Sequence, residues 1–322
     1  MANITGGHTE GFSSAAAQTE LDTILFTEFE REESPDYLSS RNELFFKQIS
    51  RDRKSFIWQE WSNVGEYEEH EEQEDIKRTD VRTANKTTVN LVKRMKSIPV
   101  SSEMRADDVH DTDSVLVRNL GDRLRLTQDK RAVLRTYADG FDGNVHNAPD
   151  GKSLYNNLHT TISGDKVDNL ETGSLNPDNL DILVQSLTNQ VAHDGELGSF
   201  VFGGILVPPA RYKTAKETMD SELVANSAEN NMNIFSTVYG TVAIKMSQFL
   251  GSGQNSATNA DTSYYIVSRE HQIIRATHTE GVTTDLIEPR FSNTDSWEYR
   301  ARYREETFPG AFHGTAAATG TA

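Results

Sequence analysis

The stretch Ser296-Trp-Glu-Tyr-Arg-Ala-Arg-Tyr-Arg-Glu305 alternates two kinds of side chain along its whole length. One set is aromatic or small: Trp297, Tyr299, Ala301 and Tyr303. The other set is charged: Glu298, Arg300, Arg302 and Arg304. Because successive side chains of a strand point to opposite faces of its sheet, the pattern predicts a long strand. One of its faces should be buried, and the other wet or paired across an interface.

Further strands are predicted around this one in the last third of the chain. They are rich in β-branched and aromatic residues and lie between turn residues. Their ranges are 264–267, 272–276 and 282–288. The tail that follows, 314–322, is made mostly of Gly, Ala and Thr. We expect it to be loose unless a neighbouring subunit holds it.

Helices are predicted in the middle of the chain. Apolar residues recur at helical spacing over 111–139, and Gly140 follows as a stop signal. A second helix begins after Asn176, a favourable N-cap residue with Pro177 at the next position. A strand, a helix and a strand are then predicted in turn: 200–207, 211–223 and 238–246.

The long helix predicted over 111–139 is the most basic stretch of an acidic protein. Its exposed positions include four cations, Arg123, Lys130, Arg131 and Arg135. One interpretation is an ordinary solvated face, partly balanced by acidic residues of the same helix. The other is a surface that contacts nucleic acid.

The first hundred residues carry apolar side chains but show little sign of forming a core of their own. Up to about residue 50 these are Leu21, Leu25, Phe29, Phe45 and Phe46. Two strands, 56–61 and 87–100, then flank a charged tip at 66–80. The first of them carries Phe56, Trp58 and Trp61. Exposed aromatic residues on a lone hairpin indicate an interface, although a local core is the alternative.

Composition excludes several classes of function. The net charge is −17, with 32 Lys and Arg against 49 Asp and Glu, which argues against a sequence-reading DNA-binding protein. There is no cysteine, and no stretch approaches the roughly 20 apolar residues of a membrane span. The acidic run 68–75 contains a single histidine, His70, and is expected to be solvated. The nine histidines show no zinc-helix spacing, and no nucleotide or nucleophile motif occurs, so neither metal, cofactor nor catalytic residue is expected.

Three stretches carry a resemblance to a known family. The first is Lys96-Ser-Ile-Pro-Val-Ser-Ser-Glu-Met104, which leads into the long helix. The second is Gly204-Ile-Leu-Val-Pro-Pro-Ala-Arg211. The third combines Tyr239-Gly-Thr-Val-Ala-Ile-Lys-Met246 with the closing Arg302-Tyr-Arg-Glu-Glu-Thr-Phe-Pro-Gly-Ala-Phe312. In this order they resemble the major capsid proteins of tailed phages, which have the Hong Kong 97 fold.

The resemblance implies an α+β chain built from the parts of that fold. These are an N-terminal arm (1–50), an extended loop hairpin (51–105), a spine helix with part of the peripheral domain (106–150), an axial domain (174–243), and the peripheral-domain sheet with a C-terminal tail (244–322). The arm and extended loop are implied to overlap adjacent subunits. The four spine-helix cations are implied to face packaged DNA.

The resemblance also implies a function. The protein would be the major capsid protein of a tailed double-stranded DNA phage, a shell subunit without catalytic activity. Hexamers and pentamers would form an icosahedral shell in the cytoplasm of a bacterial host and become the virion capsid. The genome would be enclosed without sequence specificity, and portal, scaffolding and decoration proteins would be further partners. Because the arm follows Met1 almost at once, scaffolding is expected to be a separate protein or absent.

Two other functions compete with this one. An encapsulin-type nanocompartment resembles the same fold and encloses an enzyme cargo instead of DNA. A β-rich cytoplasmic enzyme, with a site assembled from distant residues, is the competitor from another class. Assembly size separates the enzyme from the shell, and the enclosed material separates the two shells.

Overall fold

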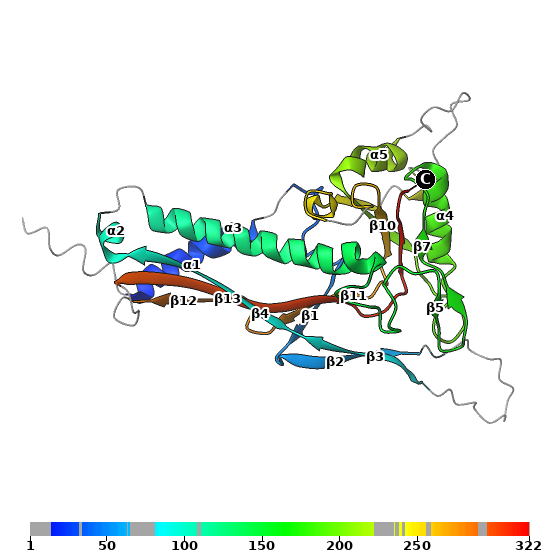
Figure 1. Cartoon of the computed structure of the whole chain (residues 1–322), viewed down its shortest axis with the longest axis horizontal. Coiled ribbons are helices and arrows are strands. Elements are labelled where there is room, and N and C mark those ends of the chain that lie inside the picture. Colours follow the sequence, from blue (N-terminus) through cyan, green and yellow to red (C-terminus); the bar gives the residue numbers. More distant parts are fainter. Residues whose placement is uncertain are drawn as a thin grey trace, which may run out of the picture.

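Strand β13 (Ser296–Pro309) is the central strand of one of two five-stranded sheets, which we call the long sheet. We describe a computed structural model, which places residues 14–31, 34–62, 64, 81–107, 111–221, 235, 238–239, 242–255, 259–288 and 295–321. Strand β4 (Val92–Ser101) pairs with β13 along one edge. The strands on the other side are β12 (Thr283–Ile287), β11 (Ile273–His278) and, parallel to β11, β1 (Lys47–Arg51). The long sheet gives the molecule its extended body (Figure 1).

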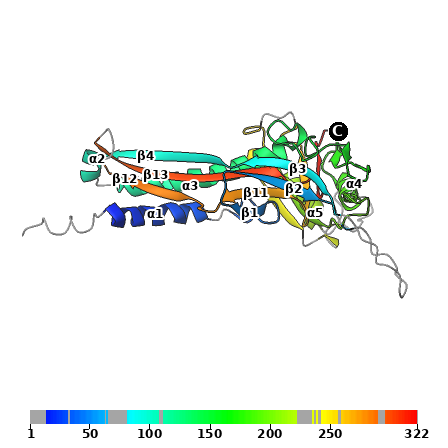
Figure 2. The ribbon, with the colours of Figure 1, turned by 90° about the horizontal axis from the view of Figure 1, so that it is seen from below.

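The alternation that predicted β13 is confirmed by its burial. Tyr299, Ala301 and Tyr303 are buried, whereas the intervening charged residues are only partly covered. The buried set packs against α1 (Ser14–Glu30) and α3 (Thr112–Val133), which lie on this face of the sheet. Figure 2 shows both helices running along the strands.

The spine helix α3 matches the helix predicted over 111–139. It continues through a π-helical turn η2 (Leu134–Ala138) and a 3₁₀ turn η3 (Asp139–Phe141), and a short helix α2 (Ser102–Ala106) precedes it. Gly121 lets α1 approach closely, since a Cβ atom there would lie 2.6 Å from the carbonyl oxygen of Leu25. The missing side chain therefore sets the distance between the two helices.

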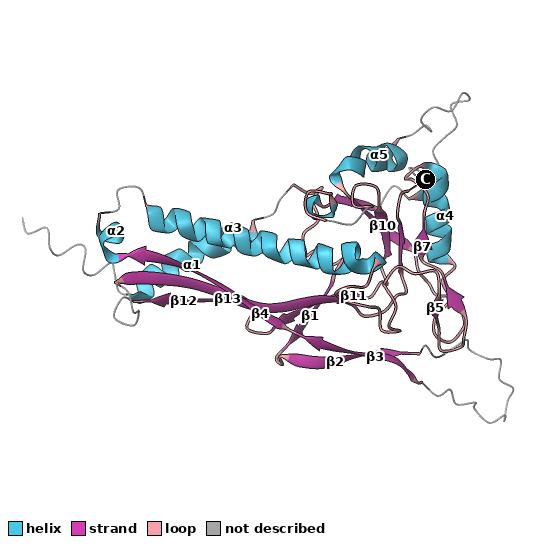
Figure 3. Cartoon of the chain, viewed as in Figure 1, coloured by secondary structure: helices cyan, strands magenta, loops and turns pink. Residues whose placement is uncertain are grey.

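The second five-stranded sheet forms the wide end of the molecule (Figure 3). Its strand order is β7 (Leu170–Glu171), β14 (Thr315–Ala318), β10 (Tyr264–Ser268), β8 (Phe202–Val207) and β9 (Ala243–Met246). Its core includes side chains of α4 (Pro177–Thr188) and α5 (Pro209–Asp220). The smaller elements are a pair β5 (His159–Thr160) with β6 (Lys166–Val167) and a turn η4 (Gln248–Leu250). The Asn176 cap is present, because its side chain accepts the Asn179 N–H at 2.8 Å.

Two expectations about the chain after residue 243 are wrong. The tail is not loose, because β14 is fully buried between β7 and β10. Small Ala side chains let it fill the middle of a sheet that is covered by helices. The segment 244–322 is also not confined to one sheet, since β10 and β14 join the sheet of β8 whereas β11, β12 and β13 form the other.

The hairpin of β2 (Ser55–Trp61) and β3 (Thr83–Asn90) is a separate two-stranded sheet. It packs through Phe56, Trp58 and Val89 on residues of β11 and β13. This is the face of the long sheet opposite to α3 (Figure 1). The expected charged tip at 66–80 lies outside the described residues, as does the acidic run with His70.

Candidate assembly surface

The hairpin presents two different faces because its strand alternates. In β2, Phe56, Trp58 and Glu60 point toward the body of the chain. Ile57 and Trp61 point to the opposite face of the hairpin. The pairing with β3 runs from Ser55 opposite Asn90 to Trp61 opposite Thr83, with an irregularity after Gln59. Among the described strands, β2 pairs with β3 alone.

The inner face of the hairpin packs on β13 and the loop after it in its own chain. The rings of Phe56 and Trp58 each lie 6.1 Å from the ring of Phe308 in edge-to-face contact. The Trp58 indole N–H also donates to the carbonyl oxygen of Gly310 at 3.1 Å. β13 therefore covers part of both rings, which are half-buried within their own chain, and their contact with a neighbouring subunit stays a prediction.

The outer face of the hairpin leaves large apolar side chains in solvent. Ile57 is 60% exposed and Trp61 is 56% exposed. Trp61 was singled out from the sequence, but Ile57 was not, although it has the same parity along the strand. Two such side chains on a hairpin of only two strands form an exposed apolar patch of the kind found at protein interfaces. We call Ile57 and Trp61 the outer hairpin patch.

Four of the five apolar residues named in the arm, all except Phe29, are buried within the same chain. Leu21 and Leu25 pack against α3 and β13, and Phe45 and Phe46 lie in the central core. The hydroxyl group of Tyr137 donates to the carbonyl oxygen of Phe45 at 2.9 Å. Their expected lack of a core is therefore wrong, because α1 folds back on the spine helix.

Phe29 ends the buried stripe of α1 and is only partly covered. The Arg41 guanidinium lies 4.0 Å from the centre of its ring, in a cation–π contact. Of the five arm residues predicted to contact a neighbour, Phe29 thus keeps the most surface for one. The contact itself stays a prediction.

The four spine-helix cations lie in different surroundings. Arg123 is exposed, and Lys130 donates to the side chain of Gln254 at 2.7 Å. Seven residues apart, these two lie on the same side of the helix. Arg135 instead forms an ion pair with the buried carboxylate of Glu306, and burial together with nearby Arg94 lowers the pKa of Arg131.

Glu306 is the centre of a buried charge network beneath the spine helix. Burial by itself raises the pKa of Glu306, but His146 and Arg135 bring the pKa below its ordinary value. Arg94 on β4 also approaches it, at 3.7 Å, and donates to the carbonyl oxygen of Glu305 at 3.1 Å. The positive charge of Arg135 thus stabilises a buried carboxylate of its own chain.

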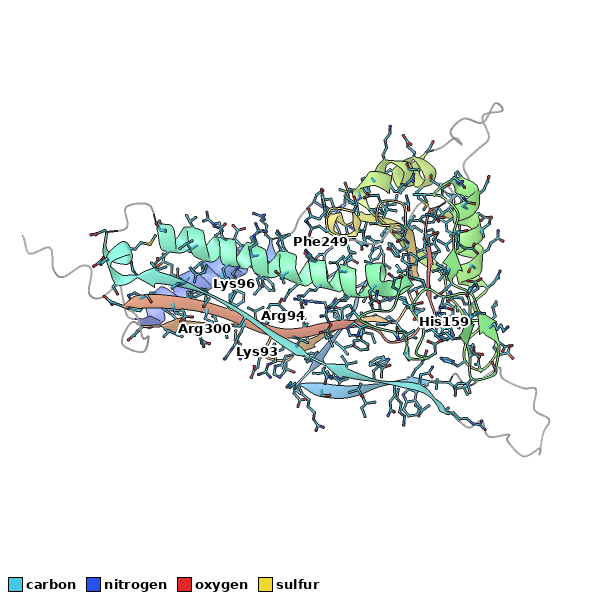
Figure 4. All side chains as sticks on the ribbon, viewed as in Figure 1. Lys93, Arg94, Lys96, His159, Phe249 and Arg300 are labelled. Atoms are coloured by element: carbon cyan, nitrogen blue, oxygen red, sulfur yellow. The ribbon has the colours of Figure 1, made fainter. Side chains whose placement is uncertain are left out.

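The face of the long sheet opposite to α3 carries a second basic surface, which was not singled out from the sequence. Lys93 on β4 pairs directly with Arg304 on β13, and the neighbouring positions of β13 on that face are Arg302 and Arg300. Figure 4 shows Lys93 and Arg300 on these two strands. Like charges opposite one another in a sheet repel. The stripe is partly neutralised within the chain, because Arg300 lies 3.1 Å from Glu298 and Arg302 lies 3.8 Å from Asp285.

Comparison with known proteins identifies the fold. No protein-family model matches the sequence, and no curated protein matches it either. Among solved structures, the virus-like particle of Pyrococcus furiosus is 13% identical with a TM-score of 0.53, over 93% of this chain and 98% of that one. The capsid of Ralstonia phage GP4 is 12% identical with a TM-score of 0.55, over 89% of this chain and 91% of that one. The SrpI encapsulin of Synechococcus elongatus PCC 7942 is 10% identical with a TM-score of 0.52, over 96% and 95%.

These structures share one architecture over nearly their whole length. The chain has the Hong Kong 97-like fold, and the predicted α+β class is confirmed. The segments that were expected to be the spine helix and the extended loop are α3 and the hairpin β2–β3, and we keep these two names for them as labels. Of the helices in the described ranges, none has the length and apolar character that crossing a bilayer requires.

Proposed function

We propose that this chain is the major capsid protein of a tailed double-stranded DNA phage. Its copies form hexamers and pentamers and then an icosahedral shell around the genome, built in the cytoplasm of a bacterial host. The role is structural, without catalysis or cofactor. The observation that carries the proposal is the fold, because the capsids and shells it matches are covered almost end to end.

The outer hairpin patch supports self-association. Burying a large apolar side chain contributes about 1.5–3 kcal/mol, and the patch has two of them in solvent. One such contact per subunit is modest, but a closed symmetric assembly repeats it many times. We propose that Ile57, Trp61 and Phe29 contact adjacent subunits.

The first experiment tests the shell and the patch together. The full chain is expressed and sized by sedimentation and negative-stain imaging, and closed particles are expected. Replacing both Ile57 and Trp61 by Ser should leave a folded subunit that assembles poorly, because the shared apolar contact is lost. Val115→Ser is the matched control, since Val115 is also exposed but lies at the start of the spine helix.

The outcomes separate the parts of the proposal. Wild-type protein that stays monomeric or dimeric, with no larger species under any salt condition, would contradict the shell function. A double variant, Ile57→Ser with Trp61→Ser, that assembles as well as the wild type would instead contradict only the role of the patch. Equal loss in the Val115→Ser control would point to a general effect on stability.

An encapsulin-type compartment is the second candidate, because an encapsulin matches the fold over 96% of this chain. The two candidates differ in what the shell encloses. Particles purified from infected cells that contain double-stranded DNA and a portal protein support the capsid. Particles that hold one enzyme and no genome support the compartment.

A further inference from the structure

Three residues from distant parts of the chain meet where the hairpin touches the wide end of the molecule. They are Glu60 on β2, His193 in the connection after α4, and His313 in the turn between β13 and β14. Each offers one potential ligand atom, and the three atoms lie within 4.8 Å of one another. The Glu60 Oε1 atom is 2.8 Å from His193 Nε2 and 3.5 Å from His313 Nδ1.

Both imidazoles are buried without the well-aligned hydrogen bonds that buried rings normally make. His193 and His313 are each 5% exposed. Within the described part of the chain, neither nitrogen of His193 makes a hydrogen bond of acceptable geometry, and His313 Nε2 makes none. A buried polar atom left unpaired costs about 1–3 kcal/mol, so such a pair of rings calls for an explanation.

The two rings are held by packing, not by hydrogen bonds. The ring of His193 stands edge-on to the rings of His313, 4.6 Å away, and Phe312, 5.7 Å away. Phe200 stacks on His313 at 5.9 Å. Behind them, the Gln190 side chain accepts the Gly314 N–H at 2.8 Å and donates to the carbonyl oxygen of Thr315 at 3.1 Å. The turn that carries His313 is therefore fixed.

We propose that Glu60, His193 and His313 bind one divalent transition-metal ion of the Zn²⁺ class. Two imidazole nitrogens and a carboxylate oxygen are a common zinc ligand set, completed by water. Ligand atoms around tetrahedral Zn²⁺ lie about 3.3 Å apart, which is close to the two separations measured from Glu60. Small side-chain rotations bring the third pair into range.

The chemistry of the three side chains and the access of water both suit a metal ion. A divalent ion binds an ionised carboxylate and neutral imidazoles, which are the ordinary forms of these side chains near pH 7. A cleft of about 700 Å³ lined by Trp61, Phe200 and Glu270 adjoins the three residues and gives water access for the fourth position.

The ion would join the extended loop to the wide end of its own subunit. Glu60 belongs to the hairpin, whereas both histidines belong to the connections beside the second sheet. Metal binding would therefore hold β2 in place, and with it the outer hairpin patch. This proposal stands on the site alone and does not require that the chain be a capsid protein.

Titration of the metal-free full chain with ZnCl₂ tests the site. We expect one ion per subunit by calorimetry, tetrahedral Co²⁺ absorption bands after substitution, and slower hydrogen exchange in β2 and β3 when Zn²⁺ is present. Glu60→Gln, His193→Gln and His313→Gln should each weaken binding by at least about tenfold. Glu60→Gln keeps the size of the side chain, so its fold should be unchanged by circular dichroism.

Two control variants make the result specific. His146→Gln removes a ring that also lies beside a carboxylate, 3.1 Å from Glu306, but without a second histidine. His70→Gln removes the histidine of the acidic run. Neither should change Zn²⁺ affinity. No stoichiometric binding, or binding that is lost in His70→Gln and kept in the three ligand variants, would overturn the proposal.

Discussion

At the scale of single residues, buried polar groups determine much of this molecule's pH behaviour. His271 is fully buried between the two sheets. Its Nε2 atom lies 2.7 Å from the carbonyl oxygen of Leu44, and its Nδ1 atom accepts the N–H of Ile273 at 3.0 Å. Both contacts suit a neutral ring that carries its proton on Nε2. Burial lowers the pKa of His271 to about 4.

This shift predicts a loss of stability in acid. The ring binds a proton more readily when the chain is unfolded, with a pKa of about 6.5, than when it is folded. Stability is therefore full above the unfolded value and falls as the pH drops from about 6.5 toward 4. At pH 5 the loss from this one group is on the order of 2 kcal/mol.

Urea unfolding of wild type and His271→Gln at pH 7 and pH 5 checks this prediction. The Gln amide can still donate to Leu44 but does not titrate, so the variant should lose less stability between the two pH values. His278→Gln serves as the control for removing a histidine elsewhere. Identical pH dependence in wild type and His271→Gln would show that the ring does not titrate as described.

At the scale of elements, the arm's position depends on one close approach between helices. α1 passes α3 at Gly121, with Leu25 on the other side. Gly→Ala inside a helix normally stabilises it by about 1 kcal/mol. Here the added methyl group would lie 2.6 Å from a backbone oxygen that cannot rotate away, and such overpacking costs about 1–3 kcal/mol.

Gly121→Ala is therefore expected to loosen the arm although it favours the spine helix itself. Hydrogen exchange should become faster in α1 while the second five-stranded sheet, β7-β14-β10-β8-β9, stays protected, and limited proteolysis should cut the arm sooner. Gly253→Ala is the control, because a Cβ atom there has open space within 4 Å. Increased protection of α1 in the Gly121 variant would refute the close approach.

The sequence predicted elements well where local periodicity carried the information. The alternation of β13 and the apolar stripe of α3 each arise from one continuous segment, so their pattern was visible. The strand β14 was missed because Thr-Ala-Ala-Ala has no alternation and weak strand propensity. Its conformation is imposed by β7 and β10, which are distant in sequence.

The candidate site was less predictable for the same physical reason. Trp61 could be named because a large aromatic side chain in a short strand is conspicuous, but the docking of Phe56 and Trp58 on Phe308 depends on how the hairpin folds over the sheet. Glu60, His193 and His313 are far apart in the chain, and their spacing resembles no metal motif. Only the tertiary structure brings them together.

At the scale of the whole molecule, charge is unevenly distributed. The chain carries a net charge of −17, yet the spine helix presents Arg123 and Lys130 on one side. We propose that this side faces packaged DNA in the assembled shell, a role that Arg135 shares least because it pairs with Glu306. An acidic wall with few cations would confine DNA while binding it weakly.

Changing Arg123 and Lys130 to Gln should leave assembly intact and reduce the DNA retained per particle. The reason is that phosphate contacts are lost while no buried pair is broken. Genome content of purified particles, measured by absorbance ratio across a salt series, checks this outcome. Lys213→Gln with Lys216→Gln on α5 is the control, because both are surface cations of another helix. Unchanged DNA content and salt dependence would rule out the contact.

The place of β14 in the second five-stranded sheet also has a consequence for biosynthesis. Residues 315–318 lie between β7 and β10, so residue 318 must be synthesised before that sheet can be completed. Until then β7 and one edge of β10 lack the strand that lies between them, and water must hydrate the backbone groups that β14 later pairs. A nascent chain released before Thr315 would therefore have an open place in this sheet, whereas the strands of the long sheet would all be present.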